Sequence, residues 1–324
     1  VMEYYAVGFI HPEYKIWEAF LTGDALAALR RDCLSGVQSV HQDVSDPEEI
    51  ATLFDPAIVY AKGARLILMV IRLMGWKKFC KGVSEYFEEF AYKNTEGDDL
   101  WNALQKYADF DVKKMMHAFV ERPGYPVITG GTSEIGGASK TSGALKLQQK
   151  RFLIDTEMPE SDWPIPEVME DMSGHYILNL SEAEFDARLA RFDELNLEEK
   201  LRLLIDRDLL TKAGLASSAT LLPLVLKFRE EESAAVWNIL LTIVSGLKIF
   251  FDYDSPEEKK YKEFLPVQWF LLPCRSGNST QDTDNGICSN KLTHKVQSVR
   301  KPWVRHKYRR FVKRCFIRNI RGHR

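Results

Sequence analysis

The sequence has no long apolar run that could cross a membrane. Its longest apolar stretch, from Val236 to Phe251, is interrupted by Asn238 and Lys248. A helix that spans a bilayer needs ~20 predominantly apolar residues, and this stretch is shorter. We therefore predict no membrane span.

Cysteine is scarce, and its placement excludes the common structural uses of this residue. The chain has five cysteines, an odd number, far apart in the sequence: Cys33, Cys80, Cys274, Cys288 and Cys315. Neither a zinc knuckle nor a disulfide framework has such spacings. A reducing compartment, the cytoplasm, is the expected location.

The first residues also lack the features of a signal peptide. VMEYYAVGFIHPEY has neither a basic start nor an apolar block, and the chain opens on Val1 instead of Met. We expect the chain to begin at a cut edge.

The seven histidines do not form a zinc motif. They are His11, His41, His117, His175, His294, His306 and His323, and no two stand four apart with a glutamate between them. A helical zinc site of the His-Glu-x-x-His type needs that spacing. We predict no metal ligand and no cofactor-binding residue in this chain. His117 and Glu121 are four apart, and a solvated or capped helix face is the interpretation of this pair.

Composition places the chain among ordinary globular proteins. It has 324 residues, of which 45% are hydrophobic and 28% charged, enough for two or three domains of ~100–200 residues. The net charge of -2 conceals an asymmetry, because residues 291–324 hold thirteen Lys and Arg and no Asp or Glu. The remainder is therefore acidic.

Hydrophobic periodicity predicts a mainly α protein. Over residues 76–90 the apolar side chains recur at steps of three and four, with charged residues between them: Trp76, Phe79, Val83, Phe87 and Phe90. This pattern indicates one amphipathic helix.

Two further helices are predicted by their ends. Ser181 followed by Glu184 is a capping box that begins one helix. Another is expected from Leu197 to Ala213, ended by Gly214. The helices after Ser181 could stack as a solenoid.

A small β segment interrupts the helices. Between Gly124 and about Pro166, glycine and proline are frequent, and the runs YPVIT and ALKLQQKRFLI favour strands.

Four runs within the first 130 residues follow the order of a known family: MEYYAVGFIHPEYKIWEAF, ALRRDCLSGVQSVHQDVSDPEEIATLFDPAIVYAKGARLILMVIRLMGWKKFCKGVSEYF, NTEGDDLWNAL and MMHAFVERPGYPVI. They resemble the zinc aminopeptidase family that includes aminopeptidase N. The most specific piece runs from Phe54 to Ala64 and resembles the family's Phe-Asp-x-Ile-x-Tyr-x-Lys-Gly-Ala block, with one extra residue between Asp55 and Ile58. Farther on, LQQKRFL and WPIP resemble the family's β-sandwich, and GHYILNL resembles the start of its C-terminal helical domain.

The resemblance implies a chemistry of which this chain holds one part. In the family, two histidines and a glutamate hold zinc, and a second glutamate is the general base. The resemblance places these residues before the segment at which this chain begins, so Glu3 is not expected to be a ligand. Tyr60 matches the family's catalytic tyrosine, whose hydroxyl would stabilise the oxyanion that forms when a zinc-bound water attacks the peptide carbonyl. Lys62 and Arg65 could reach substrate carboxylates, although a solvated helix face is the preferred interpretation.

We therefore expect a fragment of a zinc-dependent aminopeptidase that removes N-terminal residues from peptides and is inactive alone. Two alternatives stay open: a non-catalytic helical scaffold that binds a peptide or partner, and one half of a split enzyme whose ligand-bearing N-terminal half is a separate chain. Discriminating observations are peptide binding without metal and a neighbouring reading frame that carries the zinc motif.

The expected organisation has four parts. Residues 1–121 are the C-terminal part of a thermolysin-like catalytic domain, 122–172 a short β-sandwich-like segment, and 173–264 a truncated helical domain. Residues 265–324 are a basic, disordered tail. Because runs of charge are usually solvated, nucleic-acid binding is not expected except through this tail.

Overall fold

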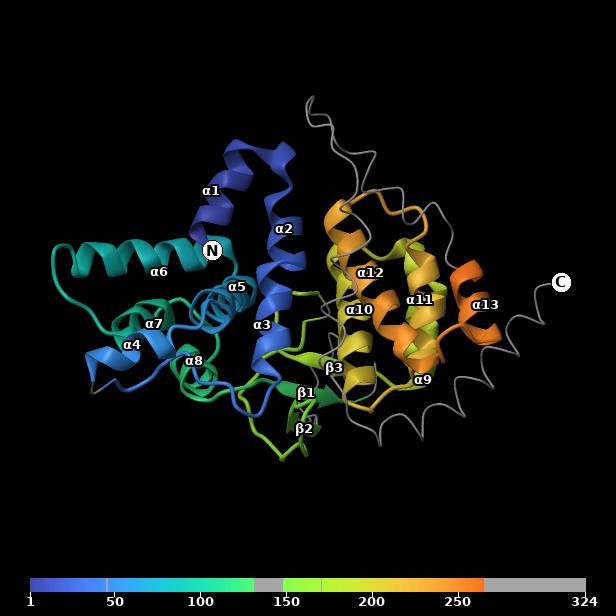
Figure 1. The fold of residues 1–324 in the computed structure, drawn as a ribbon. Coiled ribbons are helices and arrows are strands. Elements are labelled where there is room, and N and C mark those ends of the chain that lie inside the picture. Colours follow the sequence, from blue (N-terminus) through green and yellow to red (C-terminus); the bar gives the residue numbers. More distant parts are fainter. Residues whose placement is uncertain (45, 131–147, 170, 265–324) are drawn as a thin grey trace, which may run out of the picture. The chain divides into compact units, whose positions relative to one another are not determined.

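The computed structural model describes residues 1–44, 46–130, 148–169 and 171–264, which fall into two compact units (Figure 1). The first unit is Val1–Ala216, and the second begins at Ser217. The mainly α class is confirmed. The α-helices of the first unit are α1 (Met2–Ile10), α2 (Ile16–Thr22), α3 (Asp24–Asp32), α4 (Ile50–Leu53), α5 (Gly63–Met74), α6 (Trp76–Glu89), α7 (Gly97–Gln105), α8 (Val112–Glu121), α9 (Glu182–Ala190) and α10 (Leu197–Lys212).

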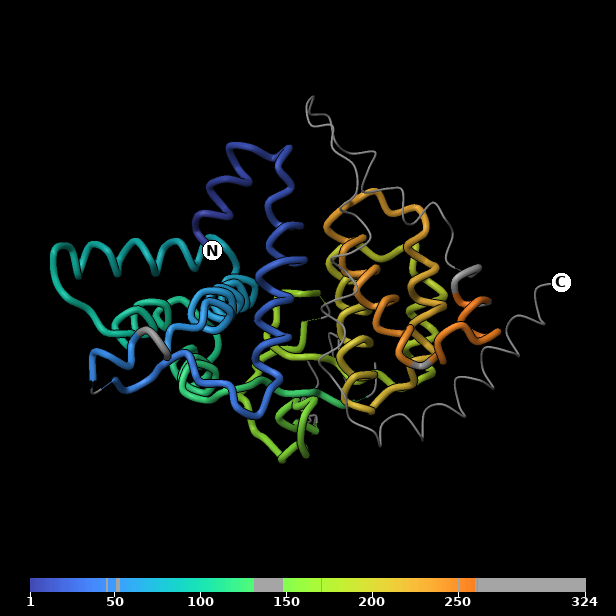
Figure 2. The backbone as a smooth tube through the Cα atoms, viewed as in Figure 1, coloured from blue at the N-terminus to red at the C-terminus, as the bar shows by residue number. Residues whose placement is uncertain are grey.

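The helices before residue 122 pack around a common apolar core. Figure 2 shows α2 and α3 following one another along one line, with Gly23 between them. The α5 helix packs against α6 and α8, and α7 contacts both α6 and α8. Leu29, Leu104 and Phe119 are fully buried in this unit. Burying such side chains contributes about 1.5–3 kcal/mol each.

The α6 helix matches the predicted amphipathic helix, but its apolar face is only partly buried. Phe79 is buried, and Gly82 lies directly against Leu104 of α7. Phe87, expected in the same stripe, is 66% exposed and contacts the ring of Tyr86 instead. The apolar stripe is therefore longer than the buried contact, which α6 makes at its middle.

One small sheet follows, as the strand-like runs predict. Its strands are β1 (Pro126–Thr129), β2 (Gln148–Arg151) and β3 (Ile177–Asn179), in the order β2-β1-β3. β1 pairs with β2 antiparallel, with Pro126 opposite Arg151, and with β3 parallel, with Val127 opposite Ile177. The sheet therefore joins chain segments about fifty residues apart.

The outer edge of β3 is closed by side chains of α10. The carboxylate of Asp206 accepts a hydrogen bond from the backbone N–H of Leu178 at 2.8 Å, and Arg202 Nη1 donates to the carbonyl of Tyr176 at 2.5 Å. Arg202 and Asp206 are one helical turn apart, and Arg202 Nη1 lies 3.7 Å from Asp206 Oδ1. An exposed strand edge leaves backbone groups free to pair with another strand, and here two side chains occupy those groups.

The predicted helix ends after Ser181 are confirmed. Ser181 and Glu184 form the capping box of α9, and Asn196 with Glu199 forms a second one at the start of α10. Gly214 has φ +77°, the left-handed conformation that ends a helix and that glycine adopts without strain.

The second unit is helical in its described part. It comprises α11 (Leu221–Lys227), α12 (Ala234–Leu247) and α13 (Pro256–Phe264). The hydroxyl of Tyr261 on α13 donates to the carbonyl of Val244 on α12. Among the described residues no helix has the length and apolarity to cross a membrane. The predicted tail, 265–324, lies outside these residues, and the four-part organisation stays a prediction.

Candidate functional site

Tyr60 lies in a π-helical turn and projects into solvent. The turn, η3, spans Ala57–Lys62 and leads directly into α5. The Tyr60 side chain is 65% exposed, and its ring meets that of Phe54 edge-on, with centroids 5.6 Å apart. By contrast, Ile58 and Lys62 in the same turn are fully buried. The predicted catalytic residue is therefore an accessible phenol on a fixed backbone.

The extra residue noted in the motif lies between Asp55 and Ile58, where the π turn begins. The N–H of Gly63 donates to the carbonyl of Ile58, five residues earlier, which is the π-helical pattern. Such a turn accommodates one more residue than an α-helical turn. Asp55 starts it: one carboxylate oxygen accepts from the N–H of Ala57 at 3.0 Å, and the other binds Arg31 on α3. Single π turns are frequent at functional sites.

A buried ionic cluster lies on the inner side of this turn. Lys62 Nζ is 3.0 Å from Asp32 Oδ2 and donates to the carbonyls of Arg122 at 3.1 Å and Gly124 at 3.2 Å. Asp32 Oδ1 accepts from the N–H of Gly124 at 2.8 Å. His175 Nε2 lies 2.9 Å from Asp32 Oδ2. Asp32 and His175 were missed by sequence reasoning, because their partners are distant in the chain and no local pattern marks them.

The prediction that Lys62 and Arg65 line a solvated helix face is wrong. Both side chains are fully buried. Arg65 Nε donates to His175 Nδ1 at 3.1 Å, and its Nη2 donates to the carbonyl of Gly174. Because the acceptors come from other segments, these cations face inward and do not reach a substrate.

The hydrogen bonds define the protonation state of His175. Its Nδ1 accepts from Arg65, so the ring proton resides on Nε2 and is donated to Asp32. Burial lowers the pKa of His175 to about 4, against the opposing effect of Asp32. Burial alone would raise the pKa of Asp32, but Lys62 and His175 outweigh it and lower that pKa. The cluster therefore holds an ionised Asp32 and a neutral imidazole at neutral pH.

His117 belongs to a surface ionic group, in agreement with the solvated-face interpretation. Its ring nitrogens lie 2.6 Å from Glu121 and 2.6 Å from Asp98, which also pairs with Lys113. Hydrogen bonding to Asp98 raises the pKa of His117 most, and Glu121 raises it further. This group links α7 and α8.

No metal centre is formed by the part of the chain that the structure describes. Within it, no three His, Cys, Asp or Glu side chains come together as ligands. A zinc ion needs three or four such ligands at once. The described residues therefore do not fit a zinc site of their own.

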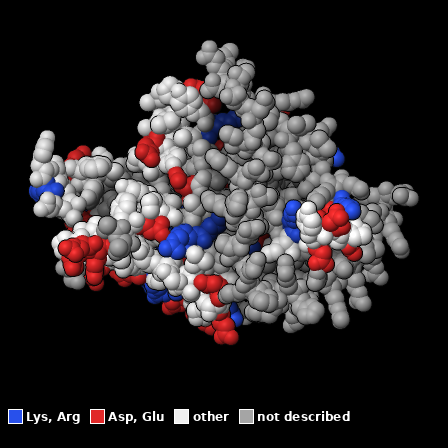
Figure 3. Space-filling view, in the orientation of Figure 1, with Lys and Arg blue, Asp and Glu red and all other residues white. Residues whose placement is uncertain are grey.

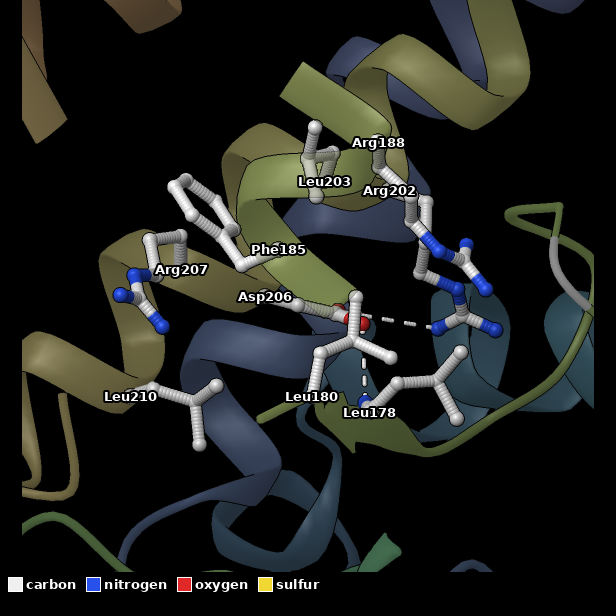
Figure 4. Close-up of a pocket in the computed structure, with 9 residues that line it drawn as sticks. All are labelled: Leu178, Leu180, Phe185, Arg188, Arg202, Leu203, Asp206, Arg207 and Leu210. Atoms are coloured by element: carbon white, nitrogen blue, oxygen red, sulfur yellow. Dashed lines mark hydrogen bonds and ion pairs between the residues drawn. The ribbon is translucent and has the colours of Figure 1, made fainter. Parts of the chain in front are cut away.

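A hollow between β3, α9 and α10 is lined by apolar side chains and a few charged ones (Figure 4). Its volume is about 10 Å³, enough for about one water molecule. Its walls are leucines and a phenylalanine, with Arg188, Arg202, Asp206 and Arg207 as the charged members. No histidine, cysteine or hydroxyl side chain lines it.

Charge on the face drawn in Figure 3 is divided among small groups of both signs. Among the described residues of that face, acidic and basic side chains lie close to one another. A nucleic-acid interface would present a field of one positive sign. These residues do not form such a field.

Comparison with known proteins places η3 and Tyr60 inside a segment that matches a peptidase family. Residues 1–119 match the Peptidase family M1 domain. The chain is 35% identical to "Aminopeptidase N" of Lactobacillus helveticus over 93% of its own length and 40% of that protein. It is 36% identical to "Aminopeptidase N" of Lactococcus lactis subsp. lactis over 94% of its length and 40% of that protein.

A more distant relative is "Aminopeptidase 2, mitochondrial" of Saccharomyces cerevisiae, 29% identical over 79% of the chain. The chain spans about 30–40% of the length of these relatives. The agreement of the family match with relatives that align along most of the chain shows that this protein belongs to the M1 peptidase family.

Proposed function

We propose that this chain supplies the catalytic tyrosine of a zinc-dependent aminopeptidase that removes N-terminal residues from peptides. The observation that carries the proposal is Tyr60: an exposed phenol on a buried, hydrogen-bonded turn, inside the segment that matches the family domain. In this role the hydroxyl donates a hydrogen bond to the oxyanion of the tetrahedral intermediate, and a donor held in place beforehand stabilises that charge most.

The chain is proposed to be inactive alone. The sequence contains no His-Glu-x-x-His, and the described residues gather no ligand set. A tyrosine without a metal or general base lowers only part of the barrier. Zinc and the base would therefore come from outside these 324 residues. The free thiols of Cys33 and Cys80 are compatible with a cytoplasmic location.

The exposed surface of α1 favours one of the two alternatives, a split enzyme whose ligand-bearing half docks on this chain. No residue of α1 is buried, and Phe9 and Ile10 are 88% and 66% exposed. Large apolar side chains in contact with solvent mark surfaces that another chain covers. A non-catalytic scaffold would use the same surface.

The first experiment measures zinc content and hydrolysis of alanyl and leucyl chromogenic amides, by the chain alone and mixed with a second polypeptide that carries the family's zinc motif. We expect neither zinc nor turnover alone, and both in the mixture. Stoichiometric zinc and turnover by the chain alone would contradict the proposed inactivity. A mixture that binds zinc without turnover would favour the scaffold.

Tyr60→Phe in the active mixture tests the assigned residue. Loss of one oxyanion donor costs ~2.7–4 kcal/mol, so kcat should fall by about two to three orders of magnitude. Because Tyr60 is exposed, the substitution should change the free energy of unfolding by no more than ~0.5 kcal/mol. The control is Tyr92→Phe, a phenol away from η3 that is more exposed still. Unchanged turnover in Tyr60→Phe would remove Tyr60 from the mechanism.

A further inference from the structure

We propose that Lys62 and Asp32 are positioning residues for Tyr60: their buried contact fixes the π turn and so the direction in which the phenol points. This inference rests on the proposed function for its consequence in catalysis. Its structural content, the coupling of the buried pair to the orientation of Tyr60, can be measured on the chain by itself.

The first step of the argument is the position of Lys62 in the turn. It stands two residues after Tyr60, and residues two apart on a helix do not share a face. Lys62 is fully buried while Tyr60 is 65% exposed. A rotation of the turn that redirected Tyr60 would therefore also draw the Lys62 ammonium out of its buried site.

The second step is the saturation of that ammonium. Lysine has three N–H donors, and Lys62 has three acceptors: Asp32 Oδ2 at 3.0 Å and the carbonyls of Arg122 and Gly124 at 3.1 and 3.2 Å. Moving it would leave a buried cation and its partners without hydrogen bonds. Breaking a buried pair in this way costs about 3–5 kcal/mol.

The third step is the rigidity of the acceptor. Asp32 terminates α3, which packs against η3, and its carboxylate also binds the N–H of Gly124 and the ring of His175. His175 is in turn held by Arg65 in the first turn of α5. Lys62 in the turn and Arg65 just after it are thus both bound to the cluster of Asp32 and His175.

A buried ion pair is weak evidence for stability as such, since well-packed apolar replacements are often neutral. The position of Lys62 in the same turn as the tyrosine therefore points to orientation as the role of this pair. The prediction is that the pair can be neutralised without unfolding the chain, but not without releasing Tyr60.

The test uses fluorine NMR of the full chain labelled with fluorotyrosine. The Tyr60 signal is assigned by its loss in Tyr60→Phe, and the buried Tyr125 and Tyr176 report on the surrounding core. In Lys62→Met and in Asp32→Asn/Lys62→Met we expect the Tyr60 signal to shift or split, and the signals of Tyr125 and Tyr176 to keep their dispersion. The matched control Lys78→Met removes an exposed pair with Asp109 and should change none of them.

An unchanged Tyr60 signal in the folded double variant overturns the proposal. If both variants unfold, amide hydrogen exchange of the native chain decides. The Gly63 N–H, which closes the π turn, should exchange within about tenfold of Leu68 in α5, and exchange about a thousandfold faster would show a turn too mobile to orient a side chain.

Catalysis gives the second readout, in the mixture with the zinc-bearing polypeptide. Misplacing a reacting group by ~1 Å can cost ~100-fold, so kcat of the double variant should fall about 10–100-fold with KM nearly unchanged. In a Tyr60→Phe background the same change should have little further effect. Additive losses overturn the coupling. A wild-type mixture without turnover would refute the proposed function alone, because the NMR result is independent of it.

Discussion

Two buried ionisable side chains of the first unit should respond to acid in opposite directions. Burial lowers the pKa of His175 from 6.5 to about 4, and burial raises that of Asp206 from 3.8 to about 6. The folded protein binds a proton at His175 less readily than the unfolded chain does. The contribution of His175 to stability is therefore full above pH 6.5 and is lost as the pH falls to about 4. The folded protein holds the proton of Asp206 more tightly than the unfolded chain does. The contribution of Asp206 to stability is therefore full below pH 3.8 and is lost as the pH rises through about 6.

We therefore expect the two contributions to offset one another between about pH 4 and 6, each amounting to about 3 kcal/mol. Relative to the wild type, Asp206→Asn should lose stability more steeply as the pH falls. His175→Gln should lose it less steeply. Urea unfolding of the three proteins from about pH 4 to 7 measures the slopes, and the titration of exposed carboxylates cancels in the differences. If the free energy of unfolding changed with pH in the same way in all three proteins, the assigned pKa shifts of His175 and Asp206 would be wrong.

At the residue scale, the sequence predicted Tyr60 through a motif but not its surroundings. Lys62 and Arg65 look like members of a charged helix face, because the residues that bind them are distant: Asp32 precedes Lys62 by thirty positions, and His175 follows Arg65 by one hundred and ten. Long-range partners of this kind leave no periodic signal. Whether Tyr60 acts in catalysis stays a prediction.

At the element scale, α6 and α7 approach each other through a glycine. A Cβ atom on Gly82 would lie 2.9 Å from Leu104 Cδ2 and 3.2 Å from its Cα, so the backbone of α7 would have to move. Gly82→Ala should cost about 1–3 kcal/mol, even though alanine favours the helix by about 1 kcal/mol.

Gly63→Ala is the matched control for that substitution. Gly63 begins α5 in helical conformation, and nothing lies within 4 Å of the position of its Cβ. This change should stabilise the protein by up to ~1 kcal/mol. Urea denaturation of both variants provides the comparison. Equal stabilisation by the two alanines would mean that α6 and α7 are less closely packed than described.

The helices were predictable where local chemistry defines them. The capping box of Ser181 and Glu184 and the glycine after α10 act within a few residues, and both ends were confirmed. The exposed Phe87 was not predictable, because periodicity shows which side chains share a face and not how far the neighbouring helix extends. The pairing of β1 with β3, fifty residues apart, likewise has no local signal.

At the scale of the whole molecule, each unit has its own apolar core. Leu104 and Leu240 are both fully buried, the first in Val1–Ala216 and the second on α12. Units with separate cores can unfold separately. We expect two calorimetric transitions, and each leucine-to-alanine change, at a cost of about 2–5 kcal/mol, should lower only one of them. A single transition lowered equally by both substitutions would show that the chain unfolds as one unit.

Composition and periodicity were sufficient for the mainly α class and the small sheet, which depend on averages over many residues. The family followed from a motif. The division between Ala216 and Ser217 depends on which side chains meet in space, and no change in composition marks it.

The closed edge of β3 makes the sheet dependent on the helical phase of α10. Arg202 and Asp206 reach the strand because they are four residues apart on one side of the helix. Inserting or deleting a single residue in the connection between α9 and α10 could be absorbed there, whereas one between Arg202 and Asp206 would turn the second side chain by about 100°. The strand would then offer a bare N–H to any extended chain nearby, including another copy of itself. Length variation should therefore be tolerated before α10 and excluded within this turn.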